Sequence, residues 1–237
     1  MTMDRYASQN ELSTRHAGLS TSRLAHHFDN LEQQREAGTL GMWVFLMTEV
    51  MFFGGIFTAY VVYRTFHAQG FAAASSQLDV NLGAINTAVL ICSSLTMALA
   101  VYAAQTGKRR GQIVFLLLTI ALGLAFLVIK FFEYKSKFDH HLVPGYSFIH
   151  DGPDGPEWQM FFSIYFALTG MHALHMVIGI GVLAVLSWQA WKARFSPEYY
   201  TPVELTGLYW HFVDIVWIFL FPLLYLIGAH TGGGGHG

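Results

Sequence analysis

The sequence has few charged side chains and a single cysteine. Asp, Glu, Lys and Arg make up 12% of its 237 residues, far below the roughly 25% of ordinary soluble domains. Cys92 has no second cysteine in the chain to pair with, which excludes an intrachain disulfide and a centre built from two thiolates of this chain. The 13 Lys and Arg are scattered rather than gathered into a basic patch, so we expect no nucleic-acid partner.

Hydrophobic residues are abundant and fall into long runs. They make up 54% of the chain, and the mean hydropathy is +0.41. A helix needs about 20 apolar residues to cross a hydrocarbon core of ~30 Å. Five runs meet this length, at residues 41–64, 82–104, 112–134, 159–188 and 205–228. The runs lack the alternation of barrel strands, so the sequence predicts an all-α polytopic membrane protein with a bundle of five transmembrane helices.

Polar segments flank the runs and suggest the domain organisation. We expect a polar cytoplasmic tail at residues 1–40, a five-helix transmembrane domain at 41–229 and a flexible C-terminal tail at 230–237. The first tail has no apolar stretch of signal-peptide length, so we expect no cleavable signal. The connection VPGYSFIHDGPDGPEW, residues 143–158, concentrates Pro and Gly and predicts a turn-rich loop.

Lys and Arg near the ends of the runs predict the orientation, because cytoplasmic connections carry an excess of them. With the N-terminus inside, nine cations face the cytoplasm: Arg5, Arg15, Arg23, Arg35, Lys108, Arg109, Arg110, Lys192 and Arg194. The opposite face receives Arg64, Lys135 and Lys137. The C-terminus is then expected on the periplasmic or extracellular side.

Few ionisable residues lie inside the runs, and these are the candidate site. Glu49 stands in GMWVFLMTEVMFFGG near the bilayer middle, where a carboxylate costs several kcal/mol unless it is protonated or paired. His172 and His175, and likewise His211 and Asp214, are three residues apart and so share a helical face. The remaining candidates are Lys130, Glu133 and Tyr134 at the end of the third run, and Asn86, Thr87, Ser93, Ser94 and Thr96 in the second.

Three interpretations of these residues remain open. An intramembrane His pair is a candidate metal or haem ligand, although the zinc-protease motif HExxH is absent. Buried Glu, His and Asp are also the groups of a proton relay. The third interpretation is structural: a protonated Glu49 bonds to His172 or His175 on a neighbouring helix. We favour the structural interpretation, and we take Lys130 and Glu133 as a snorkelling interfacial pair.

Small residues in the runs are expected where helices approach closely. The candidates are Gly54, Gly55, Gly170, Gly179 and Gly181.

Five motifs in register resemble subunit III of haem-copper respiratory oxidases, the cytochrome c oxidase subunit III family, in its five-helix bacterial form. They are GMWVFLMTEVMFFGG with the family's buried glutamate at Glu49, NTAVLICSS with Asn86, FFEYKSK with Glu133 and Tyr134, GMHALHMVIG with the paired histidines, and LYWHFVDIVWIFLF with Trp210, His211, Asp214 and Trp217. The resemblance runs from about Leu40 to Gly228. Longer members have two further N-terminal helices, and a polar tail replaces them here.

The resemblance implies a non-catalytic subunit of a terminal oxidase that reduces oxygen and pumps protons. It implies no cofactor in this chain, haem and copper in partner subunits I and II, and a place in a bacterial inner membrane. It also implies contact with phospholipid, for which Lys192 and Arg194 are the candidate headgroup contacts. Two alternatives stay open: a related accessory protein of a nitric oxide reductase, and a free-standing small membrane transporter.

Overall fold

A computed structural model of the chain describes residues 30–145, 148, 152, 154–197 and 199–231. The described residues form six helices: α2 (Leu31–Phe66), α3 (Ala68–Ser75), α4 (Val80–Gln105), α5 (Arg109–Asp139), α6 (Gly155–Trp191) and α7 (Thr201–Thr231). The chain divides into one unit at residues 1–45 and a second at 46–237. The all-α fold class is confirmed. The tails expected at 1–40 and 230–237 lie largely outside the described residues.

The first unit contributes the beginning of α2. The Asn30 side chain accepts a 2.7 Å hydrogen bond from the Gln33 backbone N–H, which satisfies one of the donors that a helix start leaves unpaired. Glu32 lies in the first turn, where a negative charge suits the helix dipole. The helix therefore begins at Leu31, before the apolar run expected from Gly41, and the last residues of the predicted tail are helical.

Five of these helices are long and apolar enough to cross a membrane, namely α2, α4, α5, α6 and α7. This confirms the five predicted spans, although every helix extends beyond its apolar run. In α6 the extension starts at Gly155, followed by Pro156 in the first turn, where proline lacks only an N–H that has no partner anyway. The last four residues of the predicted loop 143–158 are therefore helical. The rest of that loop falls partly outside the described residues.

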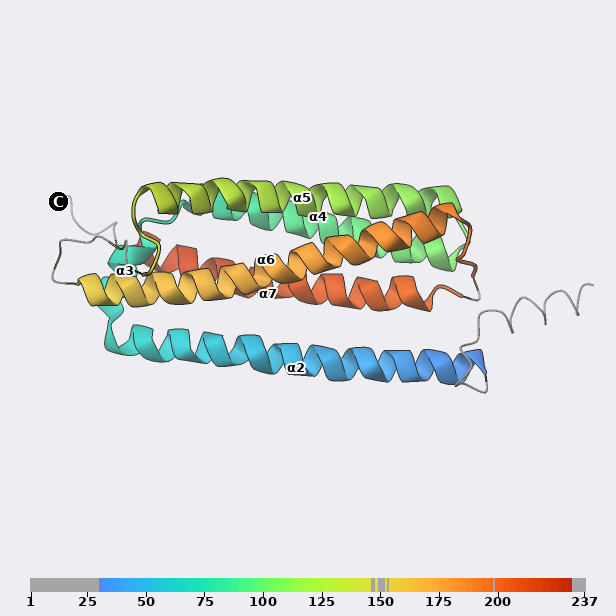
Figure 1. The fold of residues 1–237 in the computed structure, drawn as a ribbon, viewed down its shortest axis with the longest axis horizontal. Helices are drawn as coiled ribbons and strands as arrows, with labels where there is room; N and C mark the ends of the chain where they lie inside the picture. Colours follow the sequence, from blue (N-terminus) through green and yellow to red (C-terminus); the bar gives the residue numbers. More distant parts are fainter. Residues whose placement is uncertain (1–29, 146–147, 149–151, 153, 198, 232–237) are drawn as a thin grey trace, which may run out of the picture. The chain divides into compact units, whose positions relative to one another are not determined.

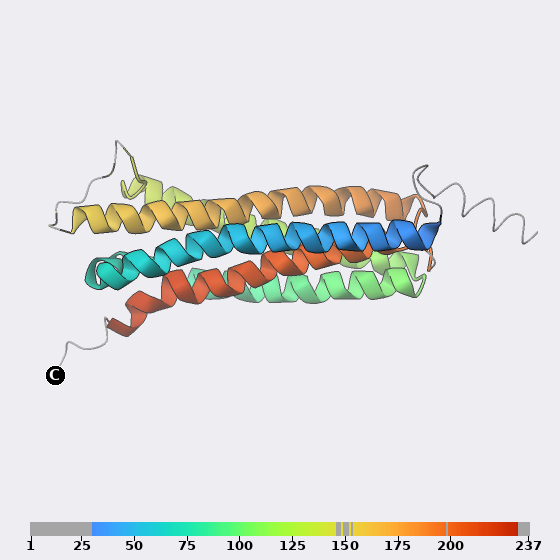
Figure 2. The same cartoon turned by 90° about the horizontal axis from the view of Figure 1, so that it is seen from below.

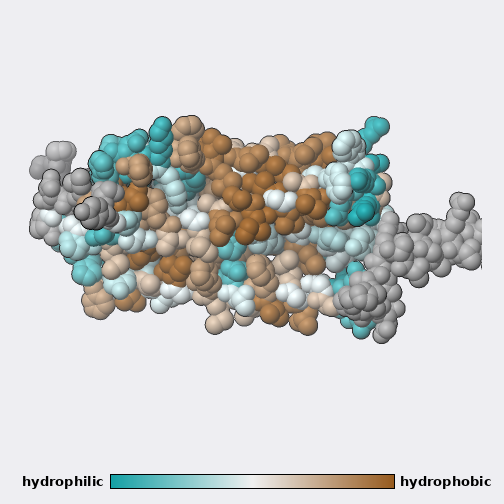
Figure 3. Space-filling model, viewed as in Figure 1, coloured by the Kyte–Doolittle hydropathy of each residue, from teal (hydrophilic) through white to brown (hydrophobic). Residues whose placement is uncertain are grey.

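Helices α4 to α7 pack side by side in the second unit (Figures 1 and 2). Helix α4 contacts α5 and α7, and α6 contacts the same two helices, so the four close into a ring. The sequence did not predict α3, a helix of eight residues that packs on α6 and α7. It is too short to span a membrane and has no long apolar run. On the face drawn in Figure 3, hydrophobic residues gather over the middle of the helices.

Glycines allow the closest helix contacts, at positions that only partly match the prediction. A Cβ added at Gly123 would lie 2.9 Å from Trp210, and one at Gly179 would lie 3.0 Å from the same ring. Added Cβ atoms at Gly54, Gly55 and Gly181 would meet no atom of the described residues within 4 Å. The prediction was therefore wrong for these three, and it missed Gly123, because sequence alone does not say which small residue faces a bulky ring.

Candidate functional site

A buried ion pair lies in the last third of α5 and is formed by two of the candidate residues from the end of the third apolar run. The Lys130 ammonium donates to Glu133 Oε2 at 3.0 Å, and both side chains are about 5% exposed or less. Lys130 and Glu133 are three residues apart and so share a face of α5. The pair is enclosed rather than snorkelling to an interface, which corrects the sequence interpretation.

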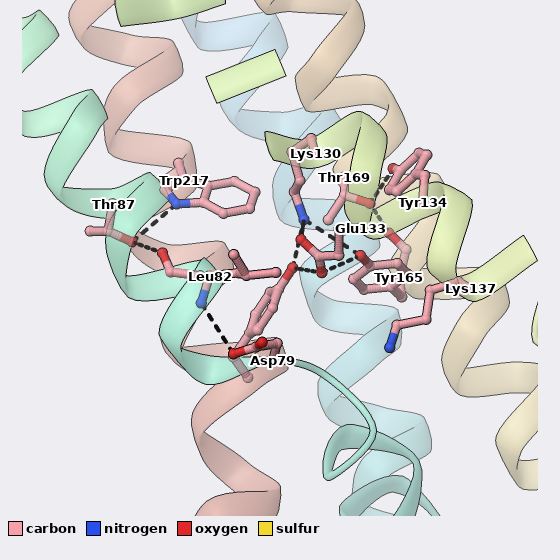
Figure 4. A network of polar contacts seen from close by, with 12 residues as sticks. Asp79, Leu82, Thr87, Lys130, Glu133, Tyr134, Lys137, Tyr165, Thr169 and Trp217 are labelled. Atoms are coloured by element: carbon pink, nitrogen blue, oxygen red, sulfur yellow. Dashed lines mark hydrogen bonds and ion pairs between the residues drawn. The ribbon is translucent and has the colours of Figure 1, made fainter. Parts of the chain in front are cut away.

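Two tyrosines from other helices complete this pair into a four-residue cluster. Tyr165 of α6 donates to Glu133 Oε1 at 2.7 Å, and Tyr225 of α7 donates to the same oxygen. Lys130 in turn donates to the Tyr225 hydroxyl and, at 3.4 Å, to that of Tyr165. Figure 4 shows Lys130, Glu133 and Tyr165 pointing toward one another. The cluster thus ties α5, α6 and α7 together with charge-assisted hydrogen bonds, the stronger kind.

Aromatic rings surround the Lys130 ammonium and connect it to the centre of the bundle. The Nζ atom lies 4.7 Å from the centroid of the Trp217 ring, a cation–π distance. The same Trp217 ring also packs against His172, with ring centroids 5.2 Å apart. The His172 centroid lies 5.3 Å from that of Phe126. Attraction to the tryptophan ring lowers the cost of holding an ammonium group away from water.

Glu49 of α2 meets His175 of α6. Glu49 Oε2 lies 3.1 Å from His175 Nε2, and the two side chains are 18% and 10% exposed. The Nδ1 atom of His175 lies 2.8 Å from the Met171 carbonyl oxygen, which only accepts, so we assign the Nδ1 hydrogen to that bond. Nε2 then accepts from a protonated Glu49 or, as imidazolium, donates to its carboxylate. Either arrangement holds one proton between the residues and leaves the pair without net charge.

His172, the other predicted partner of Glu49, makes no hydrogen bond with it. Its side chain is 1% exposed, and neither ring nitrogen has a hydrogen-bond partner among the described residues. The same holds for the side chains of Asn86 and Asp214, which are 0% and 3% exposed. The structure therefore does not join the predicted polar residues into one network.

Helices α4 and α7 are joined by a ladder of side-chain hydrogen bonds. The indole N–H of Trp210 donates to Ser93, and that of Trp217 donates to Thr87, both at 3.1 Å. A buried tryptophan N–H needs such a partner. His211 Nδ1 lies 2.7 Å from the Ser94 hydroxyl oxygen. The two signature tryptophans thus set the register of α7 against α4.

Tyr134, Lys192 and Arg194 complete the predicted residues. The Tyr134 hydroxyl bonds to Thr169 of α6 at 2.5 Å. The Lys192 ammonium lies 3.7 Å from the centroid of the Trp188 ring. Arg194 is exposed in the turn after α6.

The sequence missed Tyr165 and Tyr225, the two residues that complete the buried cluster. Lys130 and Glu133, three residues apart near the end of a span, signalled a need for partners. Tyrosine is a suitable partner because its hydroxyl both donates and accepts. Which of the 11 tyrosines would be close depended on packing that the sequence does not reveal.

The described residues contain no group of three or more His, Cys, Asp or Glu side chains arranged to hold a metal ion. They do contain hydrogen bonds that join spanning helices in pairs: α2 to α6, α4 to α7, and α5 to both α6 and α7. Such bonds fix the helices relative to one another, because polar groups inside a membrane lack water as an alternative hydrogen-bond partner.

The sequence was also compared with known proteins. The profile of the family described as Cytochrome c oxidase subunit III matches residues 24–229, from before α2 to near the end of α7. Cytochrome bo(3) ubiquinol oxidase subunit 3 of Pseudomonas aeruginosa is 32% identical over 207 residues, covering 87% of this chain and 92% of the relative. Cytochrome c oxidase subunit 3 of Alkalihalophilus pseudofirmus is 33% identical over 194 residues, covering 80% and 86%. Quinol oxidase subunit 3 of Bacillus subtilis is 31% identical over 201 residues, covering 84% and 92%.

Proposed function

Because this chain belongs to the cytochrome c oxidase subunit III family, and is thus a haem-copper oxidase subunit III, we propose that it serves the complex by structure rather than by chemistry of its own. It packs beside catalytic subunit I, in a complex that also contains subunit II, and keeps the catalytic subunit stable during turnover. Proton uptake by the complex is sustained indirectly through this rigidity. The oxygen-reducing haem and copper belong to the partner subunits.

The observation that carries this proposal is that three ionisable groups of the spanning helices, Lys130, Glu133 and Glu49, are engaged in bonds between side chains. Lys130 and Glu133 are occupied by each other and by two tyrosines, and Glu49 is occupied by His175. Groups engaged in bonds between helices hold a bundle together. Such a bundle offers a partner subunit a fixed surface.

The relatives support a task that does not depend on the electron donor. Two of them are named as quinol oxidase subunits and one as a cytochrome c oxidase subunit. A role that subunit III has in both kinds of complex concerns the assembly of the subunits in the membrane rather than the electron donor. We place the chain in a bacterial inner membrane with its N-terminus in the cytoplasm, surrounded by phospholipid.

The test is to purify the chain from its native membrane through a C-terminal tag in mild detergent. We expect haem-containing subunits to copurify, with reduced-minus-oxidised haem bands and oxygen uptake. Nitric oxide reduction in the purified complex would favour the accessory-protein alternative. A colourless chain that arrives alone and supports solute uptake in vesicles would contradict the proposal and favour a transporter.

A further inference from the structure

Three consecutive cations line a cavity at the beginning of α5. Lys108, Arg109 and Arg110, with Gly111, Ile113 and Trp191, line an open surface cavity of about 520 Å³, within the range of small-molecule sites. We propose that this cavity binds the phosphate of an anionic phospholipid, with the glycerol and the first chain carbons against Trp191 and Ile113. These six residues form the α5 basic pocket.

The charges of the α5 basic pocket lack an anionic partner in the described part of the chain. None of the ion pairs there includes Lys108, Arg109 or Arg110. The first turn of α5 contains no acidic residue, and no side chain caps it. Cations at a helix N-terminus are also repelled by the helix dipole. A bound phosphate offsets this repulsion.

Arg109 is already oriented for such a ligand. Its Nε donates to the Ala190 carbonyl oxygen of α6 at 3.0 Å, which fixes the plane of the guanidinium group. The two terminal nitrogens remain available, and they form the fork that grips a phosphate with two hydrogen bonds. The contact also brings the end of α6, and with it Trp191, to the side of the α5 basic pocket.

The level of the α5 basic pocket in the membrane favours a lipid over a free anion. Helix α5 has 31 residues, or ~46 Å at ~1.5 Å per residue, which exceeds the ~30 Å hydrocarbon core. Its first turn therefore reaches headgroup level, where lipid phosphates lie. Trp191 is 70% exposed, and tryptophan at this level is typical of membrane interfaces. Cations beside an exposed apolar ring suit an amphiphile better than inorganic phosphate.

This assignment differs from the headgroup contacts suggested by sequence, Lys192 and Arg194. The Lys192 ammonium is engaged with the Trp188 ring at 3.7 Å. Neither residue lines the α5 basic pocket. Lys108 and Arg110 are therefore the basic residues to vary in the pocket. Lys192, which follows Trp191 in the sequence but does not line the pocket, is a basic residue for comparison.

The test titrates the detergent-purified protein, with whatever subunits accompany it, after removal of loosely held lipid. Short-chain phosphatidylglycerol, phosphatidylcholine of the same chain length and inorganic phosphate are added, and bound lipid is read by native mass spectrometry. In the double variant K108Q/R110Q we expect the Kd for phosphatidylglycerol to rise about 30-fold. Arg109 is kept because it holds α6. Each single variant, K108Q or R110Q, should give about a fivefold rise if the double variant does not fold.

The control variant K192Q removes one cation from the same end of the bundle and should leave the Kd unchanged. An equal rise in K192Q would show a diffuse surface charge effect and overturn the site. Equal binding of phosphatidylcholine would remove the requirement for an anionic lipid. Displacement of phosphatidylglycerol by inorganic phosphate at similar concentration would identify an anion site without lipid specificity. None of these outcomes depends on which partner subunits copurify.

Discussion

At the scale of single residues, charge is tolerated in this bundle where the charged groups face one another. Glu133 receives hydrogen bonds from Lys130, Tyr165 and Tyr225. A carboxylate with three donors from three helices loses little on leaving water, whereas one deprived of its cation becomes an uncompensated buried charge. The cluster therefore stabilises the bundle only while both charges and their hydrogen-bond partners are present.

We expect Lys130→Met and Glu133→Gln each to destabilise the bundle by about 3 kcal/mol or more, since each leaves the other charge buried without its counterion. The double variant removes both charges and should lose less than the sum of the two. The measurement is the thermal unfolding midpoint of the purified complex for the four members of this cycle. Strictly additive shifts would show that the ion pair carries no coupling.

A second residue-scale prediction concerns Glu49. Glu49→Ala removes the partner of His175 Nε2 and should lower the yield and durability of the complex, while haem spectra of assembled complex stay normal. Glu49→Gln keeps a donor toward Nε2, so its yield should lie close to that of the unchanged protein. Complex yield and reduced haem spectra provide the two readouts. A shifted haem band in intact Glu49→Ala complex would contradict the structural role.

At this scale the sequence predicted which residues are unusual but not which of them meet. Glu49 attracts notice because it is the only carboxylate in its apolar run, and its contact with His175 rather than His172 depends on how α6 is rotated. Three-residue spacing puts His172 and His175 on neighbouring positions of one face. It does not show that only one of them reaches α2.

At the scale of helices, Trp210 illustrates how α7 is locked against its neighbours. Its indole is fully buried, donates to Ser93 of α4, and lies against Gly123 of α5 and Gly179 of α6. Four helices therefore meet around one ring. Each contact requires either a hydroxyl at the right height or the absence of a side chain.

We expect Gly123→Ala and Gly179→Ala each to destabilise the bundle by about 1–3 kcal/mol, because the added methyl group presses on a rigid, enclosed ring. Gly181→Ala is the matched control, since an added Cβ there meets no described atom within 4 Å and alanine favours helix. Unfolding midpoints of the three variant complexes check this. Equal midpoints for Gly123→Ala and Gly181→Ala would mean that Trp210 is loosely held.

The sequence predicted the long helices well and their ends poorly. Apolar runs mark the part of a helix that lies in hydrocarbon, whereas Leu31–Phe66 and Gly155–Trp191 continue into polar residues. Caps and first-turn residues decide these ends, as Asn30 and Pro156 do. Helix α3 escaped prediction because a short alanine-rich segment owes its place to packing against α6 and α7 rather than to periodicity.

At the scale of the whole molecule, the orientation in the membrane rests on the distribution of Lys and Arg. Thr106 lies three residues before the first residue of α5, Arg109, and His140 directly follows its last residue, Asp139. A helix that spans the membrane puts them on opposite faces. The excess of cations in the connection before α5 predicts that Thr106 is cytoplasmic and His140 periplasmic.

Cysteine labelling in cells tests this orientation. In a Cys92→Ser background, His140→Cys should react with a membrane-impermeant maleimide from outside, whereas Thr106→Cys should react only after the inner membrane is opened. Both positions are exposed in the structure, so failure to react reflects the membrane barrier rather than burial. The Cys92→Ser parent, which has no other cysteine, gives the background signal. The reverse pattern would invert the topology and put the α5 basic pocket on the periplasmic face, because the pocket and Thr106 lie at the same end of α5.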